Sequence, residues 1–161
     1  MLFRSRVVED IREKLAFKDS KVIRAGFERK NLVYLVREVE DKQKYLLKTL
    51  NKNKGYGIIY TRSRKRTREI AELLVKNHVS ADYYHAGLDY DTREIKQDRW
   101  QKGDKRIMVA TNAFGMGIEK ADVRFVIHYD MPDTIEAYYQ EAGRAGRDGK
   151  KAFAVLLYNN S

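Results

Sequence analysis

Two arginines stand three residues apart in a glycine-rich run, Gln140-Glu-Ala-Gly-Arg-Ala-Gly-Arg-Asp-Gly149. Arginine carries a permanent charge on a planar group that matches the oxygens of a phosphate. Glycine lets the backbone approach a ligand closely and adopt positive φ angles. A spacing of three places the Arg144 and Arg147 side chains on one side of a helical turn. The run therefore predicts a grip on the terminal phosphate of a nucleotide during its transfer, with a basic surface loop as the alternative.

A second run leads almost directly into the arginines. From Val109 to Pro132 it reads Val-Ala-Thr-Asn-Ala-Phe-Gly-Met-Gly-Ile-Glu-Lys-Ala-Asp-Val-Arg-Phe-Val-Ile-His-Tyr-Asp-Met-Pro. Residues 109–149 as a whole closely resemble motifs V and VI of the RecQ family of DNA helicases, in helicase superfamily 2. Residues 57–64, Gly-Ile-Ile-Tyr-Thr-Arg-Ser-Arg, resemble motif IV of that family, and residues 84–88 resemble the element that follows it.

Composition supports a folded, nucleic-acid-binding protein. The chain has 161 residues, of which 43% are hydrophobic and 35% charged, as expected for one globular domain. Its net charge of +10 favours a polyanionic partner, most simply nucleic acid. The chain has no cysteine, and its three histidines show no ligand spacing, so we expect no metal site within it. No apolar run reaches the ~20 residues of a membrane span, and the N-terminus lacks the apolar core of a signal peptide. We therefore expect no membrane partner and a location in the cytoplasm with the bacterial nucleoid, or in the nucleus of a eukaryote.

Strand-like and helix-like segments alternate along the chain. Apolar runs such as Gly57–Tyr60 and Phe125–His128 are typical of parallel strands that are buried on both faces. The alternation predicts an α/β fold, a mainly parallel sheet with helices on both faces, and the resemblance likewise implies a three-layer RecA-like domain. In such a sheet the loops after Tyr60, His85, Ala110 and Tyr129 converge on one edge, where ligands bind. We expect strands over residues 21–27, 32–38, 56–61, 81–85, 106–111, 124–129 and 152–158, and helices over residues 4–17, 41–53, 63–77, 91–102 and 134–142, with Asp41 and Ser63 as caps.

Two motifs of a nucleoside triphosphatase are absent from the sequence. There is no phosphate loop of the form G-x-x-x-x-G-K-[ST] and no apolar strand that ends in an Asp-Glu pair. Asp130 ends a strand alone, as a loop or capping carboxylate. In the RecQ family both motifs lie in a first RecA-like domain, and a four-cysteine zinc module follows the second. We therefore expect residues 1–20 to be the tail of the preceding motor domain or a connector. Residues 21–161 would be the second RecA-like domain, and both the first domain and the zinc module would be missing.

The resemblance implies nucleotide contacts in motifs V and VI. Arg147 matches the arginine finger of the family, and Arg144 matches a second phosphate contact. Gln140 is implied to orient the γ-phosphate side of the site. Gly117 and Glu119 are implied to lie near the nucleotide sugar, although relatives often have aspartate or asparagine in place of Glu119. The alternatives are an ion pair of Arg147 with Glu141 or Asp148, a surface amide for Gln140, and a solvated turn carboxylate for Glu119.

The remaining candidates are implied to contact DNA. Arg62, Ser63 and Arg64 open a helix whose N-terminus favours anions, and the resemblance places this turn on the DNA backbone. Simple capping by Ser63 is compatible with that role.

Three further candidates follow strands. The resemblance favours a DNA contact for His85, and a buried strand-end histidine is the alternative. Thr111 and Asn112 follow a strand and suit phosphate or ribose contacts. The alternative for Thr111 is to cap a short helix through Phe114.

The function implied for the intact protein is an ATP-dependent DNA helicase that moves 3′ to 5′ along single-stranded or partly duplex DNA. ATP and Mg²⁺ would be held mainly by the first RecA-like domain, so we expect this fragment alone not to hydrolyse ATP. One alternative is the second domain of another superfamily 2 enzyme, such as an RNA helicase. The other alternative is a stand-alone nucleic-acid-binding module without ATP chemistry.

Overall fold

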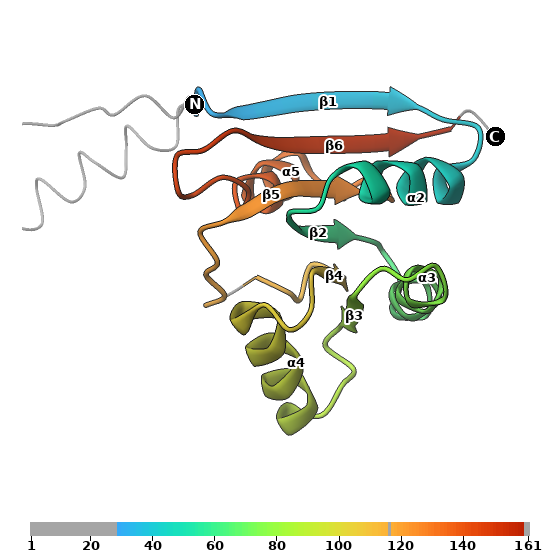
Figure 1. Ribbon diagram of the computed structural model, residues 1–161, viewed down its shortest axis with the longest axis vertical. Helices are drawn as coiled ribbons and strands as arrows, with labels where there is room; N and C mark the ends of the chain where they lie inside the picture. The colour runs from blue at the N-terminus through green and yellow to red at the C-terminus, as the bar shows by residue number, and fades with distance from the viewer. Residues whose placement is uncertain (1–28, 116, 160–161) are drawn as a thin grey trace, which may run out of the picture.

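Six parallel strands form a single sheet in the computed structural model, which describes residues 29–115 and 117–159 (Figure 1). Their order across the sheet is β1-β6-β5-β2-β4-β3, and every adjacent pair is parallel. This confirms the predicted α/β class and the parallel sheet. The strands are β1 (Leu32–Glu38), β2 (Tyr56–Tyr60), β3 (Ala81–Tyr84), β4 (Ile107–Ala110), β5 (Val123–His128) and β6 (Ala152–Tyr158).

Each of the four helices in the described ranges begins at a side chain that accepts a hydrogen bond from the first turn. Such caps satisfy amide groups that have no partner inside the helix. The predicted caps Asp41 and Ser63 are confirmed, since they accept from the amides of Lys44 and Arg66. None of these helices is long and apolar enough to cross a membrane. The helices and their caps are α2 (Lys42–Lys52, Asp41), α3 (Arg64–Lys76, Ser63), α4 (Tyr90–Lys102, Asp89) and α5 (Ile135–Ala142, Thr134).

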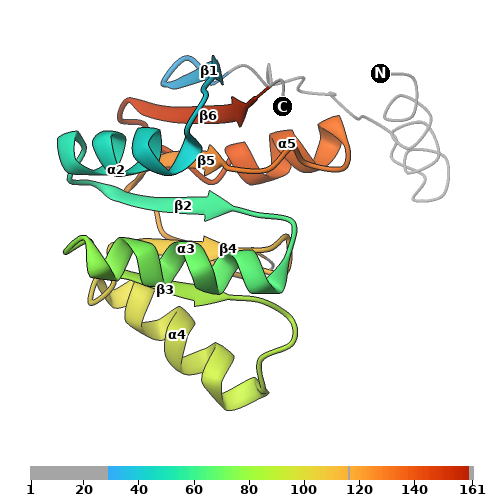
Figure 2. The same cartoon turned by 90° about the vertical axis from the view of Figure 1, so that its right-hand side faces the viewer.

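The sheet lies between two pairs of helices (Figures 1 and 2). Successive side chains of a strand point to opposite faces, so the apolar run of β2 supplies both cores. Ile59 packs with the buried side chains of α2 and α3. Its neighbours Ile58 and Tyr60 pack on the other face, where Trp100 of α4 and Ala142 of α5 are buried. The three-layer arrangement predicted from the sequence is therefore confirmed.

The predicted elements agree with the observed ones to within about two residues wherever the two can be compared. The predicted helix over residues 4–17, the predicted strand over residues 21–27 and the proposed boundary at residue 20 lie outside the described residues.

The arginine-rich run does not form the helical turn that its spacing predicted. Helix α5 ends at Ala142, and residues 143–149 form successive turns. Gly143 has a helical φ of −64°, but Gly146 and Gly149 have φ angles of 64° and 79°. Only glycine adopts such left-handed backbone without strain. A Cβ on Gly146 would also lie 2.6 Å from Asn31 Nδ2 and 2.8 Å from Ala152 Cβ, whereas nothing lies within 4 Å of one on Gly149.

We predict that Gly146→Ala destabilises the domain more than Gly149→Ala does. Both changes force an L-residue into left-handed backbone, at about 1–2 kcal/mol. Gly146→Ala adds an overlap in a packed site and should lower the free energy of unfolding by about 3 kcal/mol in total. Denaturant unfolding of the two variants measures the difference. Equal losses would show that the Gly146 turn is not packed as described.

Candidate functional site

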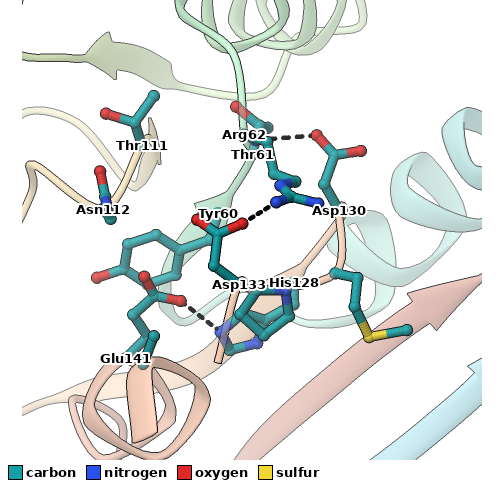
Figure 3. Close-up of a pocket in the computed structure, with 12 residues that line it drawn as sticks. Tyr60, Thr61, Arg62, Thr111, Asn112, His128, Asp130, Asp133 and Glu141 are labelled. Carbon is teal, nitrogen blue, oxygen red and sulfur yellow. Dashed lines mark hydrogen bonds and ion pairs between the residues drawn. The ribbon is translucent and has the colours of Figure 1, made fainter. Parts of the chain in front are cut away.

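A polar pocket lies where the carboxyl ends of β2, β4 and β5 meet (Figure 3). The cavity has a volume of about 90 Å³, with Tyr60 and His128 among the residues that line it. Three of the four loops expected to converge, those after Tyr60, Ala110 and Tyr129, meet here. His85 is not among the lining residues, so the fourth loop does not reach this pocket. The pocket is lined by Tyr60, Thr61, Arg62, Thr111, Asn112, His128, Asp130, Met131, Pro132, Asp133, Ala137 and Glu141.

Asp130 ties the end of β5 to the start of α3. One of its carboxylate oxygens accepts from the backbone amide of Arg62 at 3.0 Å, and the other lies 2.6 Å from Arg66 Nη1. The sequence-based interpretation of Asp130 as a loop or capping carboxylate is therefore confirmed. The Arg62 guanidinium forms an ion pair with Asp133, and both side chains are more than half exposed. Exposed ion pairs of this kind contribute little to stability.

Thr111 and Asn112 line the same pocket as Arg62. Thr111 is 9% exposed and its carbonyl accepts from the amide of Phe114 at 3.0 Å. Residues 111–114 form a turn, so the alternative that Thr111 caps a short helix is wrong. Asn112 is exposed and its side chain makes no hydrogen bond to any residue that the structure describes.

Arg64 and His85 lie together beyond this pocket. Arg64 begins α3, and its guanidinium fills the space beside Gly87, where a Cβ would lie 2.6 Å from Nη1. The His85 ring stacks on Tyr83 with centroids 5.8 Å apart. Burial and the nearby Arg64 charge lower the pKa of His85 below its ordinary value, so the neutral ring predominates at neutral pH. His85 is only partly buried, and its Nδ1 has no hydrogen-bond partner within the described ranges.

The two arginines of the glycine-rich run line a second, smaller cavity together with Trp100, Phe114 and Lys120. Arg147 Nη1 lies 3.4 Å from Glu119 Oε1, in an ion pair whose side chains are 38% and 84% exposed. The alternative partners proposed for Arg147 are engaged elsewhere. Glu141 contacts His128 at 2.9 Å, and Asp148 pairs with Arg124 at 2.6 Å.

Arg144 is held more deeply than Arg147. A Cβ on Gly115 would overlap its guanidinium, so this glycine makes room for the arginine. The Nε of Arg144 is buried and has no hydrogen-bond partner in the part of the chain described. Gly117 has a φ of 74° with open space around it. Gln140 is exposed on α5, and no hydrogen bond joins its side chain to either arginine among the described residues.

Comparison with known proteins identifies the family. The helicase conserved C-terminal domain matches residues 41–149. The chain belongs to that family. It is 42% identical over 154 residues to the ATP-dependent DNA helicase RecQ of Bacillus subtilis, covering 95% of this chain and 26% of the relative. It is 45% identical over 151 residues to the RecQ of Pasteurella multocida, covering 93% of this chain and 24% of the relative. The resemblance of this helicase C-terminal domain to the RecQ family is confirmed.

The fold also matches a solved structure of a DEAD-box protein. The E. coli DEAD-box protein SrmB, in a structure with the regulator of ribonuclease activity A, superposes with a TM-score of 0.74 at 26% identity. The match covers 82% of this chain and 79% of the SrmB chain. The helicase C-terminal domain spans about a quarter of the length of its curated RecQ relatives.

Several residues at these sites were not found from the sequence. His128 is fully buried at the end of β5. Its ring stacks on the Tyr60 ring, and its Nε2 forms a hydrogen bond with Glu141. The Lys120 side chain is 9% exposed, lies 3.7 Å from the Tyr56 ring centroid, and donates to the Gln101 carbonyl. The charge of Lys120 gave no sign of such burial in the sequence. The one available signal for His128 was its position directly after the apolar residues 125–127.

Tyr60 joins the two cavities of the helicase C-terminal domain. Its side chain lines the polar pocket, and its hydroxyl donates to the Phe114 carbonyl at 3.0 Å, beside the arginines. Burial raises the pKa of Tyr60 far above its ordinary value, and the charge of Arg144 opposes that rise, so the hydroxyl keeps its proton.

We predict that Tyr60→Phe lowers the free energy of unfolding by about 1–2 kcal/mol, because it leaves the buried Phe114 carbonyl without its donor. Tyr84→Phe is the matched control. Tyr84 is also buried, but its hydroxyl makes no hydrogen bond to described residues, so its loss should change stability by less than about 0.5 kcal/mol. Denaturant unfolding compares the two, and equal effects would contradict the role given to the Tyr60 hydroxyl.

Proposed function

We propose that this domain is the second motor domain of an ATP-dependent DNA helicase. In this proposal it delivers Arg147 to the terminal phosphates of ATP and provides part of the track for single-stranded DNA. The RecQ relatives are named DNA helicases, and this supports DNA as the nucleic acid that the domain binds. The chain is more similar to them, at 42–45% identity, than to the DEAD-box protein, at 26% identity. The proposed location is the cytoplasm with the bacterial nucleoid, or the nucleus in a eukaryote.

The proposal rests on the partners that the Arg147 and Arg144 side chains have and lack. Arg147 projects from a turn with fixed backbone, and its one ion-pair partner among described residues, Glu119, is an exposed carboxylate. A weak pair of this kind leaves the guanidinium available to a stronger anion. Beside it, the buried Nε of Arg144 lacks an acceptor. Two permanent cations at one cavity suit a phosphate chain whose charge shifts during transfer.

The same residues fit the nucleotide that the family implies. Gly117 has open space around its left-handed backbone, and Glu119 faces Arg147 from the same loop. Arg147 and Arg144 would contact the phosphates, while Gln140, Gly117 and Glu119 would line the nucleotide. ATP with Mg²⁺ supplies the phosphoryl group and the neutralisation of its charge. In this domain, Arg147 stabilises the charge that develops on the phosphoryl oxygens. Water is excluded from the site when the domain approaches the first RecA-like domain.

The partner in this proposal is the first RecA-like domain of the same protein. Closure of the two domains around ATP would bring Arg147 into the site, and opening after hydrolysis would withdraw it. The proposed DNA contacts are Arg62, Thr111 and Asn112 at the edge of the pocket, with Ser63, Arg64 and His85 next to it. In each cycle these residues would shift their contacts along the single-stranded DNA in the 3′ to 5′ direction. A helicase C-terminal domain without the first domain would hydrolyse no ATP.

We predict that Arg147→Ala in the complete protein lowers kcat for ATP hydrolysis by about 10³-fold or more, with a much smaller change in ATP affinity. An arginine finger acts mainly on the transition state, so its loss affects kcat selectively. In the 161-residue chain the same change should alter stability by less than about 0.5 kcal/mol. Steady-state kinetics and thermal melting measure the two effects.

Lys150→Ala, which removes an exposed cation from the same turn region, is the control and should leave kcat unchanged. Full turnover in Arg147→Ala, or unfolding of the chain, would show that the arginine is structural.

We predict that single-stranded DNA binds through phosphate contacts and is therefore sensitive to salt. Each neutralised phosphate contributes about −0.7 to the slope of log K against log salt. Replacing both Arg62 and Arg64 by alanine should reduce the magnitude of this slope by about 1.4. Because the pKa of His85 is lowered from its ordinary value of 6.5, a third contact should form only on acidification, so affinity should rise as the pH falls below 6.5. Fluorescence anisotropy across salt and pH measures both effects.

Two variants serve as controls for DNA binding. Lys76→Ala lies at the opposite end of α3 and should leave the slope unchanged. His85→Gln should abolish the rise in affinity at low pH. A slope that the double variant does not change would place the track elsewhere on the domain.

A further inference from the structure

The segment just before β1 contacts the turn that carries Arg147, more than 110 residues later in the chain. Arg29 Nη1 donates to the Gly143 carbonyl at 2.8 Å, and Arg29 Nη2 donates to the Gly146 carbonyl. Asn31 Nδ2 donates to the same Gly146 carbonyl at 2.7 Å and to the Lys150 carbonyl at 2.9 Å. The Arg29 and Asn31 side chains therefore donate hydrogen bonds to three carbonyls within residues 143–150.

The carbonyls of this turn receive few donors from its own backbone. Helix α5 ends at Ala142, and the carbonyls at a helix end have no partner in the helix itself. The Gly143 carbonyl accepts no backbone hydrogen bond from a described residue, whereas the Gly146 carbonyl accepts one from the Gly149 amide at 3.1 Å in addition to those from Arg29 and Asn31. The planar fork of Arg29 reaches two of these carbonyls at once, which the single ammonium group of a lysine does less well.

The opposite side of the turn is anchored through its amides. The Gly146 amide donates to the Val123 carbonyl at 2.8 Å, and the Asp148 amide donates to the Ala121 carbonyl at 3.1 Å. Arg147 stands between these two anchored residues, so its backbone is fixed while its side chain stays 38% exposed. The amides are anchored by Ala121, just before β5, and by Val123 at its start, and the carbonyls are anchored by Arg29 and Asn31.

We propose that Arg29 and Asn31 are positioning residues that set the direction in which the Arg147 side chain projects from the domain. This inference rests on the proposed function of Arg147 as the arginine that contacts ATP. A displacement of about 1 Å at a catalytic group can reduce the rate by about 100-fold. Arg29 and Asn31 contact only the backbone of the turn, so their loss affects the transition state more than the binding of ATP.

The first test compares Arg29→Met, Arg29→Lys, Asn31→Ala and Arg147→Ala in the complete protein. Arg29→Met keeps the length of the side chain but removes its donors, and kcat for ATP hydrolysis should fall about 10- to 100-fold with KM for ATP unchanged within about twofold. Asn31→Ala should act in the same direction. Arg29→Lys retains one donor group and should recover part of the lost kcat. Lys30→Ala is the control, because Lys30 is exposed and its side chain makes no hydrogen bond or ion pair with a described residue.

The second test measures amide hydrogen exchange at Gly146 and Asp148 in the 161-residue chain. Arg29→Met should speed exchange at both amides by about tenfold or more, whereas Lys30→Ala should not. Unchanged exchange together with unchanged kcat overturns the inference. An equal rise in exchange over the whole sheet also overturns it, because the two residues would then stabilise the fold rather than the turn.

The variants distinguish the role of Arg147 from the roles of Arg29 and Asn31. If Arg147→Ala retains full kcat, the proposed function of Arg147 is wrong. If Arg147→Ala lowers kcat and the Arg29 and Asn31 variants do not, the proposed function stands and the positioning role is wrong.

Discussion

The left-handed backbone at Gly146 is the constraint on which the arginine site depends. Four residues after α5 ends at Ala142, a φ of 64° at Gly146 changes the direction of the chain. After the turn, amides face the start of β5 and carbonyls face Arg29 and Asn31. The packing leaves no room for a side chain at Gly146, since Asn31 and Ala152 occupy the space. The position of Arg147 therefore follows from backbone geometry and does not depend on a partner for its own side chain.

The parallel sheet places the polar pocket and the arginine cavity on different parts of one domain. The pocket lies at the carboxyl ends of β2, β4 and β5, as the topology requires. The arginines lie over the face that α4 and α5 share, above Trp100 and Phe114. Tyr60 belongs to both, because its ring lines the pocket and its hydroxyl bonds to the Phe114 carbonyl.

The fold could be predicted from the sequence because its signals are local. Apolar runs indicated the strands, Asp41 and Ser63 indicated helix starts, and alternation of the two elements indicated the parallel sheet. The end of helix α5 at Ala142 was predicted correctly. The same local rule was wrong for the arginine run, since a spacing of three predicted a helical turn where α5 has already ended and Gly146 has left-handed backbone.

The site was only partly predictable, because its contacts join residues far apart in the chain. The residues chosen by type and spacing divide into three groups: the pocket edge with Arg62, the pair of Arg64 and His85, and the cavity of the two arginines. The pairing of Glu119 with Arg147 spans 28 residues, and the contact of Arg29 with Gly146 spans 117. No periodicity reports such pairs. They become visible only when the strand order brings the start of β1 beside β6 and the turn that precedes it.

The role of Arg147 is tested most directly by a structure of the complete protein with ADP and aluminium fluoride, which mimics the phosphoryl group in transfer. We expect Arg147 to leave Glu119 and to place a guanidinium nitrogen about 3 Å from the fluoride, with the backbone of residues 143–150 unchanged. If Arg147 remains paired with Glu119, or points to solvent while another residue contacts the fluoride, Arg147 is not the arginine that contacts the phosphate.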